Sequence, residues 1–559
     1  MNHYDVVIIG TGAGGGTLLH GLAATGKRIL VLERGPFLPR EKQNWDTRVA
    51  FNTTRYFGPE VWQDRDGNDL RAGMCYHVGG NTKLYGAALF RLRERDFEAI
   101  RHADGISPEW PIKYRDWEPW YSRAEELYQV HGEAGLDPTE PWRSGPYSWP
   151  AVSHEPRIEE IADALRGRGL RPSYTPLGVR LDERQRHLSP CIRCSTCDGY
   201  PCLVHAKADA EVSAVRPVMD EPNVTLLVET KAERLLTDPT GGAVTGVEVL
   251  LDGDRVVFTA DLFVVSCGSI NSAALLLRSA NDRHPRGLAN SSGLLGRNLM
   301  KHVLGSVIGV SSFKTNPTRF QKSLSLFDYY WGESGFEFPM GQIQTLGKVS
   351  KAELEGSETM YAPLDIDFVS SHSVDWWLTT EDLPRAENQV RLSRDGRIVI
   401  DYTETNASEF ERLMTRWKQV LQDIGCGCHI LPNGRYFNAG SVTTFTTKLG
   451  TSGLGHQVGT AKFGEDPETS VLDLSCRAHD LDNLYVVDGS FFVSSAAVNP
   501  TLTIIANALR VAAHLRERLG TTRTSKSLNA MHGRAAPRAH PVCPDSIGWA
   551  SRVEAAVEP

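Results

Sequence analysis

Three glycines near the start of the chain have a type and spacing that suit binding of a dinucleotide. Gly10, Gly12 and Gly15 form the pattern G-x-G-x-x-G. The pattern follows an apolar run, 4–9, and opens a helical stretch, which is the context that gives it meaning. Gly10 allows a tight turn, Gly12 lets backbone approach a pyrophosphate, and Gly15 lets the helix pack close to the strand. The free N–H groups of the helix N-terminus favour phosphate.

A second apolar run, 28–33, ends at Glu33. A carboxylate at the end of this second strand is suited to accept hydrogen bonds from ribose hydroxyls. Ala13 and Gly14 within the turn, and Arg34 beside Glu33, are expected to contact the same ligand. The motif predicts a dinucleotide but does not decide between FAD and NAD.

Four cysteines within twelve residues form a second candidate site. Cys191, Cys194, Cys197 and Cys202 have the spacing C-x2-C-x2-C-x4-C. Thiolates this close in sequence can converge on one zinc ion or one iron–sulfur cluster. The ferredoxin pattern differs, because its last gap is shorter and its proline follows the final cysteine. A structural zinc, one or two disulfides, and reduced buried thiols remain open alternatives.

The composition excludes several classes of function. The chain has 559 residues, which is enough for two or more domains. Its net charge of −8 argues against nucleic-acid binding. We expect no membrane span, because no apolar run is long enough to cross a bilayer. We expect a cytoplasmic protein, because the first strand begins at Tyr4 and leaves no room for a signal peptide.

The pattern of elements predicts an α/β fold with an inserted antiparallel sheet. Buried strands are predicted at 223–229, 244–251, 255–259 and 260–265, with a hairpin turn at Asp252-Gly253-Asp254. The character changes after residue 303. From there short alternating runs predict antiparallel strands around one helix at 409–424, the strands being 303–311, 366–371, 388–392, 397–402 and 442–447.

Several stretches resemble the glucose–methanol–choline (GMC) oxidoreductases. They are Val78–Arg93 with its glycine pair, Trp110–Glu125, Ala260–Leu277 and Leu288–His302. The resemblance covers residues 4–130, 220–310 and 450–515. It implies a Rossmann-like FAD-binding domain with an inserted antiparallel substrate-binding domain, and it favours FAD over NAD.

The resemblance implies further cofactor contacts. They come from the second glycine loop, from the turns after two later strands and from a stretch near the C-terminus, namely Gly79, Gly80, Asn81, Thr82, Ala232, Cys267, Gly268, Asp488, Gly489, Asn499, Pro500 and Thr501. Some relatives attach FAD through a histidine in the second glycine loop. Lys83-Leu84-Tyr85 stand there in this chain, so we expect non-covalent FAD.

The resemblance also implies a catalytic pair. In GMC enzymes a stretch such as Gly455–Gly464 carries a catalytic histidine, and one such as Asp488–Thr503 carries its partner; by position these are His456 and Asn499. Oxidation of an alcohol by hydride transfer to flavin N5 requires removal of the hydroxyl proton. Imidazole suits that step near neutral pH. A neutral amide can hold the same oxygen without competing for the proton. Asn499-Pro500 can also simply start a turn or helix.

The domain boundaries follow from these assignments. The FAD-binding domain is predicted at 1–115, 205–302 and 455–520, the substrate-binding domain at 303–454, a covering segment with the cysteines at 116–204, and a loose tail at 521–559.

The expected substrate is a small-molecule alcohol, with O2 or another molecule as electron acceptor. We expect a sugar, glycoside or amino sugar, because Arg319–Tyr330 resembles a mobile active-site loop of pyranose oxidases in the family. An amphipathic surface loop is the alternative. Sugar faces also stack on aromatic rings such as Phe327, Tyr329, Tyr330, Trp331, Trp376 and Trp377.

Other functions stay open at this stage. The rings would equally suit a sterol, an aryl alcohol or a choline-like substrate. A non-catalytic flavin electron-transfer module and an NAD-linked dehydrogenase are the remaining alternatives. An iron–sulfur cluster beside FAD would favour a dehydrogenase that delivers electrons onward.

Overall fold

The computed structural model describes residues 3–53, 55–251, 253–311, 313–352, 366–426 and 454–521. The chain divides into residues 1–514 and 515–559, and the sheets described below belong to the first unit. The predicted strand at 442–447 and the predicted tail beyond residue 521 lie outside the described residues.

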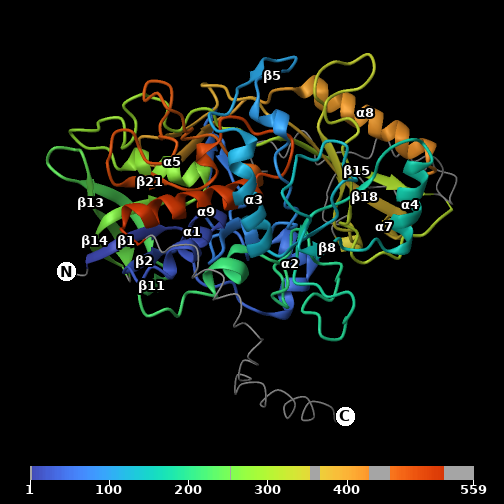
Figure 1. Ribbon diagram of the computed structural model, residues 1–559, viewed down its shortest axis with the longest axis horizontal. Helices are drawn as coiled ribbons and strands as arrows, with labels where there is room; N and C mark the ends of the chain where they lie inside the picture. Colours follow the sequence, from blue (N-terminus) through green and yellow to red (C-terminus); the bar gives the residue numbers. More distant parts are fainter. Residues whose placement is uncertain are drawn as a thin grey trace, which may run out of the picture. The chain divides into compact units, whose positions relative to one another are not determined.

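A parallel sheet lies on the left of Figure 1. Its strands run in the order β11-β2-β1-β14-β21, with bounds Val224–Leu227, Ile29–Leu32, His3–Ile9, Asp254–Val265 and Leu484–Val486. The continuous apolar runs are explained by burial on both faces of the sheet. Helices α1 (Ala13–Ala23) and α5 (Ser269–Arg278) follow β1 and β14. The turns between these strands and their helices meet at one edge of the sheet.

An antiparallel meander extends this sheet. It consists of β12 (Lys231–Thr237), β13 (Val244–Leu251) and the first half of β14. Leu251 pairs with Asp254, so β13 and β14 form the predicted hairpin. The two strands predicted at 255–259 and 260–265 are one long strand that pairs with β13 first and with β1 and β21 later.

The inserted sheet is antiparallel, as predicted, and lies on the right of Figure 1. Its order is β15-β18-β17-β16-β9, with bounds Val303–Val310, Ser373–Thr380, Gln342–Thr345, Leu324–Leu326 and Ser173–Tyr174. Helices α4 (Pro156–Arg166) and α8 (Ala407–Asp423) contribute buried side chains to the same core. Trp376 of β18 packs on Trp417 of α8 at 4.6 Å between ring centroids.

Two predictions in this region are wrong. Residues 366–371 belong to helix α7 (Ile366–His372), and the strand is the next segment, β18. A short apolar run does not by itself distinguish strand from helix, and neighbouring β15 and β17 select Ser373–Thr380 for pairing. The stretch 319–330 is not a surface loop, and it is not a loop throughout. It contains β16, and its side chains from Phe320 to Phe327 are buried.

Smaller elements complete the fold. A four-stranded sheet has the order β19-β20-β3-β4, with bounds Gln389–Leu392, Ile398–Asp401, Trp62–Asp64 and Asp69–Leu70. A three-stranded sheet has the order β10-β7-β8, with bounds Leu177–Gly178, Val130–Gly132 and Trp149–Pro150. β5 (Ile100–Arg101) pairs with β6 (Ile106–Ser107). The remaining α-helices in the part of the chain that the structure describes are α2 (Thr47–Asn52), α3 (Tyr114–Leu127) and α9 (Thr501–Arg518).

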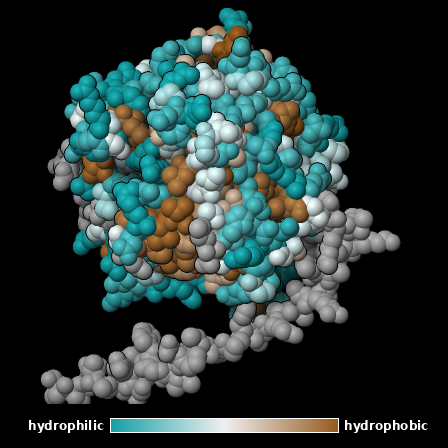
Figure 2. All heavy atoms as spheres, turned by 90° about the vertical axis from the view of Figure 1, so that its left-hand side faces the viewer, coloured by the Kyte–Doolittle hydropathy of each residue, from teal (hydrophilic) through white to brown (hydrophobic). Residues whose placement is uncertain are grey.

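The face at the left of Figure 1 is mixed in polarity. Figure 2 looks onto this face and shows a band of apolar side chains bordered by hydrophilic ones. Leu250 of β13 and Val257 of β14 are among the large apolar residues that are exposed. No helix in the described part of the chain is long and apolar enough to cross a membrane.

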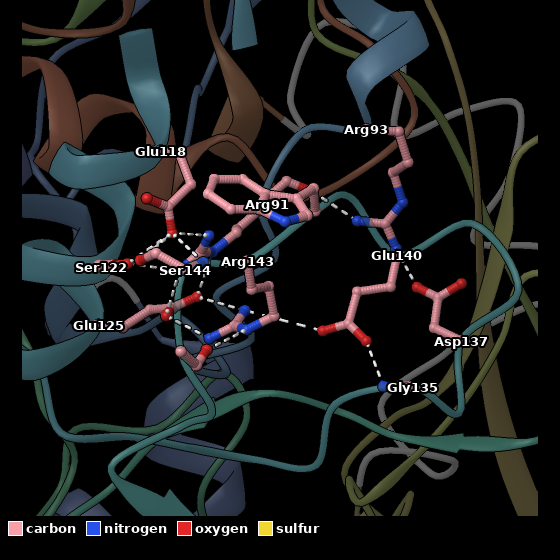
Figure 3. Close-up of polar contacts among 12 residues, drawn as sticks. Arg91, Arg93, Glu118, Ser122, Glu125, Gly135, Asp137, Glu140, Arg143 and Ser144 are labelled. Carbon is pink, nitrogen blue, oxygen red and sulfur yellow. Dashed lines mark hydrogen bonds and ion pairs between the residues drawn. The ribbon is translucent and has the colours of Figure 1, made fainter. Parts of the chain in front are cut away.

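A buried ionic network fastens α3 to its surroundings (Figure 3). Arg91 contacts Glu125 at 2.7 Å and Glu118 at 3.1 Å, both on α3. Arg143 contacts Glu125 at 2.6 Å. Next to it Arg93 pairs with Asp137 and lies over the ring of Phe327, 4.1 Å from its centroid. The network thus connects α3 with Phe327, which directly follows β16 of the inserted sheet.

Replacing Arg91 by Met should destabilise the protein strongly. Arg91 is 3 % exposed, and its loss leaves two buried carboxylates short of a partner, which costs about 3 kcal/mol or more. Arg255→Met is the control, because Arg255 pairs with Glu248 at the surface, where such pairs contribute about 0–1 kcal/mol. Urea denaturation measures both. Equal, small losses for the two variants would contradict a structural role for the network.

Candidate active site

A cavity of about 790 Å³ opens at the carboxyl ends of β1, β2, β14 and β21. Its size lies in the range of small-molecule and cofactor sites. Every predicted site residue lines it except Gly15, Gly79 and the cysteine cluster. The lining therefore includes Gly10, Gly12, Ala13, Gly14, Glu33, Arg34, Gly80, Asn81, Thr82, Ala232, Cys267, Gly268, His456, Asp488, Gly489, Asn499, Pro500 and Thr501.

The first glycine turn separates into binding and packing positions. A Cβ on Gly12 would meet no described atom within 4 Å, so this position faces open space. A Cβ on Gly15 would lie 2.0 Å from the carbonyl oxygen of Gly10, so Gly15 serves helix–strand packing, as its absence from the lining indicates. No side chain caps the N-terminus of α1, which leaves its first N–H groups for a ligand.

The Glu33 carboxylate is buried and organises the two glycine loops. It accepts hydrogen bonds from the Thr11 hydroxyl at 2.5 Å and from the Gly35 N–H at 3.1 Å. The Thr11 hydroxyl in turn accepts from the N–H of Gly79 in the second loop at 3.1 Å. Burial raises the pKa of Glu33. Thr11 was not predicted, because nothing in the glycine pattern specifies the variable position.

Asp488 ties the turn after β21 to the turn after β14. Its carboxylate accepts from the Gly268 N–H at 3.0 Å and from the Ser272 hydroxyl at 2.5 Å. It also accepts from the Ser490 N–H at 2.8 Å. Asp488 is 4 % exposed, so these bonds compensate the burial of its carboxylate. The chain direction after β21 is fixed by this residue.

The structure brings His456 and Asn499 together. Asn499 Nδ2 lies 3.5 Å from His456 Nε2. The other ring nitrogen, His456 Nδ1, lies 3.0 Å from Nδ1 of His302, whose Nε2 lies 3.0 Å from the Ser495 carbonyl oxygen. Burial lowers the pKa of His302 to about 4. Burial also lowers the pKa of His456 well below its usual range, and His302 and Lys322 lower it further. Both imidazoles are therefore neutral at pH 7.

Two glutamines hold the Asn499 amide. Gln344 Nε2 lies 3.0 Å and Gln342 Nε2 3.3 Å from Asn499 Oδ1. They are two residues apart on β17, so their side chains lie on the same face of the strand. Sequence reasoning missed both glutamines and His302. His302 ends a stretch that carries the family resemblance, but β17 has no local motif that marks it.

An ion pair borders the same cavity. Lys322 Nζ lies 2.6 Å from Asp198 Oδ2, and both residues line the cavity. A Cβ on Gly86 would lie 2.1 Å from Lys322 Nζ and 2.4 Å from Asp198 Oδ1, so glycine leaves room for the pair. Asp198 lies in the cysteine segment, whose carbonyls at Cys197 and Tyr200 are held by the buried Lys207 ammonium.

The aromatic prediction is largely wrong. Of the six rings expected at the substrate, Trp377 alone lines the cavity. Phe327, Tyr330 and Trp376 are 2 % exposed or less and belong to packed interior regions. The aromatic part of the lining comes mainly from the FAD-binding half and the cysteine segment, through Phe51, Phe57, Tyr76, Tyr85 and Tyr200.

The metal interpretation of the cysteine cluster finds no support. Cys191, Cys194, Cys197 and Cys202 are free thiols. Among the residues that the structure describes, no group of three or more His, Cys, Asp or Glu side chains is placed to hold a metal ion. The contribution of this segment to the site is Ser195, Asp198, Gly199 and Tyr200, which form one wall of the cavity.

Two family models match the chain. The N-terminal GMC oxidoreductase model matches residues 4–304, and the C-terminal model matches residues 384–508. The chain belongs to the GMC oxidoreductase family. Members of this family bind FAD. The match confirms the family resemblance and the fold class predicted from the sequence. It also confirms the predicted type of reaction, which is FAD-dependent oxidation of a CH–OH group.

This GMC oxidoreductase is similar over nearly its whole length to curated relatives. It is 30 % identical to 6'''-hydroxyparomomycin C oxidase of Streptomyces lividus, over 93 % of each chain. It is 31 % identical to paromamine 6'-oxidase of Streptomyces fradiae, over 91 % of this chain and 90 % of the relative. The fold matches the crystal structure of pyridoxine 4-oxidase from Mesorbium loti with a TM-score of 0.62, at 18 % identity, over 92 % of this chain and 99 % of that one.

The residues present fit FAD. The open space over Gly12 and the uncapped start of α1 suit a pyrophosphate, and Glu33 lies at the cavity wall beyond them. His456, Asn499 and Lys322 line the same continuous cavity, which therefore has room for a cofactor and for a second reactant.

Gly12→Val should abolish flavin binding without disturbing the fold. The new side chain would occupy open space that the ligand needs, whereas Gly15→Ala would strike backbone at 2.0 Å and destabilise the protein itself. Flavin absorbance per chain and the unfolding temperatures of deflavinated proteins separate the two effects. Normal flavin content in Gly12→Val would contradict the assignment of this space to the cofactor.

Proposed function

We propose that this GMC oxidoreductase oxidises a CH–OH group of a sugar, a glycoside or, preferentially, an amino sugar to a carbonyl. The observation that carries the proposal is the ion pair between Lys322 and Asp198, which lines the same cavity as His456 and Asn499. A carboxylate and an ammonium at the cavity wall suit a substrate with several hydroxyl or amino groups. They suit a sterol or an aryl alcohol poorly, because those substrates would leave the polar groups unpaired.

The relatives support the same class. The two Streptomyces proteins are named for oxidation of paromamine and of a paromomycin, which are amino-sugar compounds. Asp198 offers a carboxylate for a substrate ammonium or hydroxyl.

In the proposed mechanism the substrate hydroxyl lies between His456 and Asn499. His456 Nε2 removes the hydroxyl proton as the C–H bond breaks, and the oxygen becomes a carbonyl oxygen. Asn499 Nδ2 donates to this oxygen while negative charge develops on it, and the Lys322 ammonium stabilises the same charge. When bound, FAD supplies the acceptor for the hydride that leaves the carbon. Proton and hydride together account for the two electrons and two hydrogens removed.

The proposal extends to the linkage of FAD, the electron acceptor, the location of the protein and its domains. We propose non-covalent FAD, because His456 is the one histidine among the described residues that line the cavity. We propose O2 as electron acceptor, because both Streptomyces relatives are named oxidases. The eight described cysteines are free thiols, in keeping with a cytoplasmic location. The discontinuous FAD-binding domain, the substrate-binding domain and the cysteine segment keep their predicted limits in this proposal.

The substrate class is tested by anaerobic flavin reduction with a panel of alcohols. Paromamine and related amino sugars should bleach the flavin fastest, neutral sugars more slowly, and benzyl alcohol, cholesterol and choline least. Asp198→Asn should raise KM for amino sugars more than for neutral sugars. Readmitting air to the reduced enzyme should release hydrogen peroxide. Fastest bleaching by an apolar alcohol would contradict the proposal.

His456→Gln tests the base. The variant should keep its flavin but reduce it at least a hundredfold more slowly, the usual contribution of a general base. Reduction at the wild-type rate would assign the proton transfer elsewhere, or would indicate an electron-transfer protein without an alcohol substrate. His154→Gln serves as a control, because His154 bonds the Ser323 hydroxyl and is not among the residues that line the cavity.

The pH dependence follows from the lowered pKa of His456. A base works in its neutral form, so kcat/KM should be retained above this pKa and lost as the pH falls through it, below about pH 6.5. Lys322→Met removes one cause of the lowering, so the acidic limb should move to higher pH. Asp198→Asn leaves the Lys322 charge uncompensated, so the limb should move to lower pH. The pH profiles of the three enzymes provide the check.

A further inference from the structure

A continuous series of short contacts runs through the catalytic pair. It begins at the Ser495 carbonyl oxygen, passes His302 and His456, and reaches Asn499. It ends at Gln342 and Gln344, which flank Asn499 Oδ1. His302, Gln342 and Gln344 are not exposed, each at 0 %.

The carbonyl end gives the series a direction. A carbonyl oxygen only accepts, so His302 Nε2 must carry the proton that it donates to Ser495. A neutral His302 then has a bare Nδ1, which can only accept. His456 Nδ1 lies 3.0 Å away and must be the donor. Because His456 is also neutral, its Nε2 is left bare, and it is this nitrogen that faces Asn499.

The glutamine end agrees with this direction. A bare imidazole nitrogen attracts an N–H and repels a carbonyl oxygen, so Asn499 must turn its amino group toward His456. Its Oδ1 then faces away, toward two amino groups supplied by Gln342 and Gln344. With the Asn499 amide reversed, Oδ1 would face the bare nitrogen of His456. The bare nitrogen thus selects one of the two amide orientations, and the amino groups of Gln342 and Gln344 hold Oδ1 in it.

We propose that His302, Gln342 and Gln344 are positioning residues of a directional hydrogen-bond chain in which every donor points toward the Ser495 carbonyl. His302 fixes the tautomer of His456, and the glutamines fix the amide of Asn499. The chain thereby presents one lone pair, on His456 Nε2, beside one donor, on Asn499 Nδ2. This inference rests on the proposed function for its catalytic meaning, but the chain itself is a property of the resting protein.

The chain also determines how His456 responds to protonation. A proton added at Nε2 would face the Asn499 amino group, which cannot accept it. The charged or titratable groups that act on His456 are His302, which is neutral, and Lys322, whose ammonium is paired with Asp198. Loss of the glutamines would let the Asn499 amide rotate, and its oxygen could then stabilise the imidazolium.

The tautomers can be measured directly. In holoenzyme labelled with [15N]histidine, long-range 1H–15N correlations distinguish a protonated from a bare ring nitrogen. Signals of the two residues are assigned from their loss in His456→Gln and His302→Gln. The expected result is His456 with its proton on Nδ1 and His302 with its proton on Nε2. A proton on His456 Nε2 in the resting enzyme would overturn the proposal.

The glutamines are tested by the double variant Gln342→Met, Gln344→Met. Its matched control is Gln321→Met, a buried glutamine nearby that bonds Asn316, Leu346 and Asp375 rather than Asn499. Both enzymes should bind flavin. The double variant should lose about tenfold in kcat/KM, and its acidic limb should move to higher pH. The limb of the control should stay in place. A double variant that matches the control in both respects would overturn the role of the glutamines.

The proposed function and the hydrogen-bond chain are tested by different outcomes. If no alcohol reduces the flavin of the wild-type protein, the proposed function is wrong, and the tautomer measurement still decides whether the chain exists. If alcohols do reduce the flavin but His456 carries its proton on Nε2, the function stands and the chain is wrong.

Discussion

The site depends on the way Asp488 holds two turns together. The carboxyl ends of β14 and β21 are neighbours in the parallel sheet. Asp488 lies in the turn after β21, and its buried carboxylate accepts hydrogen bonds from Gly268 and Ser272, which follow β14. After Asp488 the chain reaches Ser495 seven residues later and Asn499 eleven residues later. On the way the Trp110 indole N–H bonds the Ser494 hydroxyl, and the Tyr330 hydroxyl accepts from the Ala497 N–H. These bonds hold the segment that carries Asn499 in place relative to the turn after β21.

The parts of this site that sequence could predict are those that backbone geometry dictates. A turn that must approach phosphate requires glycine, so Gly10, Gly12 and Gly15 mark it at fixed spacing, and Gly15 has the packing role expected of it. The parallel strands were predictable for a similar reason, since burial on both faces demands continuous apolar runs. His456 and Asn499 were found through resemblance to a family, because neither residue has a local pattern that separates it from a structural histidine or an ordinary turn.

The parts that could not be predicted come from pairing between distant strands. β16 joins β9, more than a hundred residues earlier, and this pairing buries the stretch that was expected to be a loop. The same sheet places Gln342 and Gln344 against Asn499, although an isolated Gln-Ile-Gln-Thr carries no functional signal. The prediction that these aromatic rings contact the substrate was largely wrong for a related reason. Trp376 and Trp377 are adjacent on β18, and alternation sends one into the core and the other to the cavity.

The two ends of the cavity therefore use different chemistry, and this has a consequence for specificity. The nucleotide end is built from backbone turns, so its shape is set by glycines and tolerates little change. The reactive end is built from side chains of four segments that meet only in the folded protein. They are Asp198 from the cysteine segment, Lys322 just before β16, Gln344 from β17, and His456 from the C-terminal part of the chain. A substitution at Asp198 can alter which alcohol binds. The direction of the hydrogen bonds through His302, His456 and Asn499 stays the same, because it is set by the Ser495 backbone carbonyl, which no side-chain substitution removes. In this architecture the substrate can change while the proton-transfer geometry is retained.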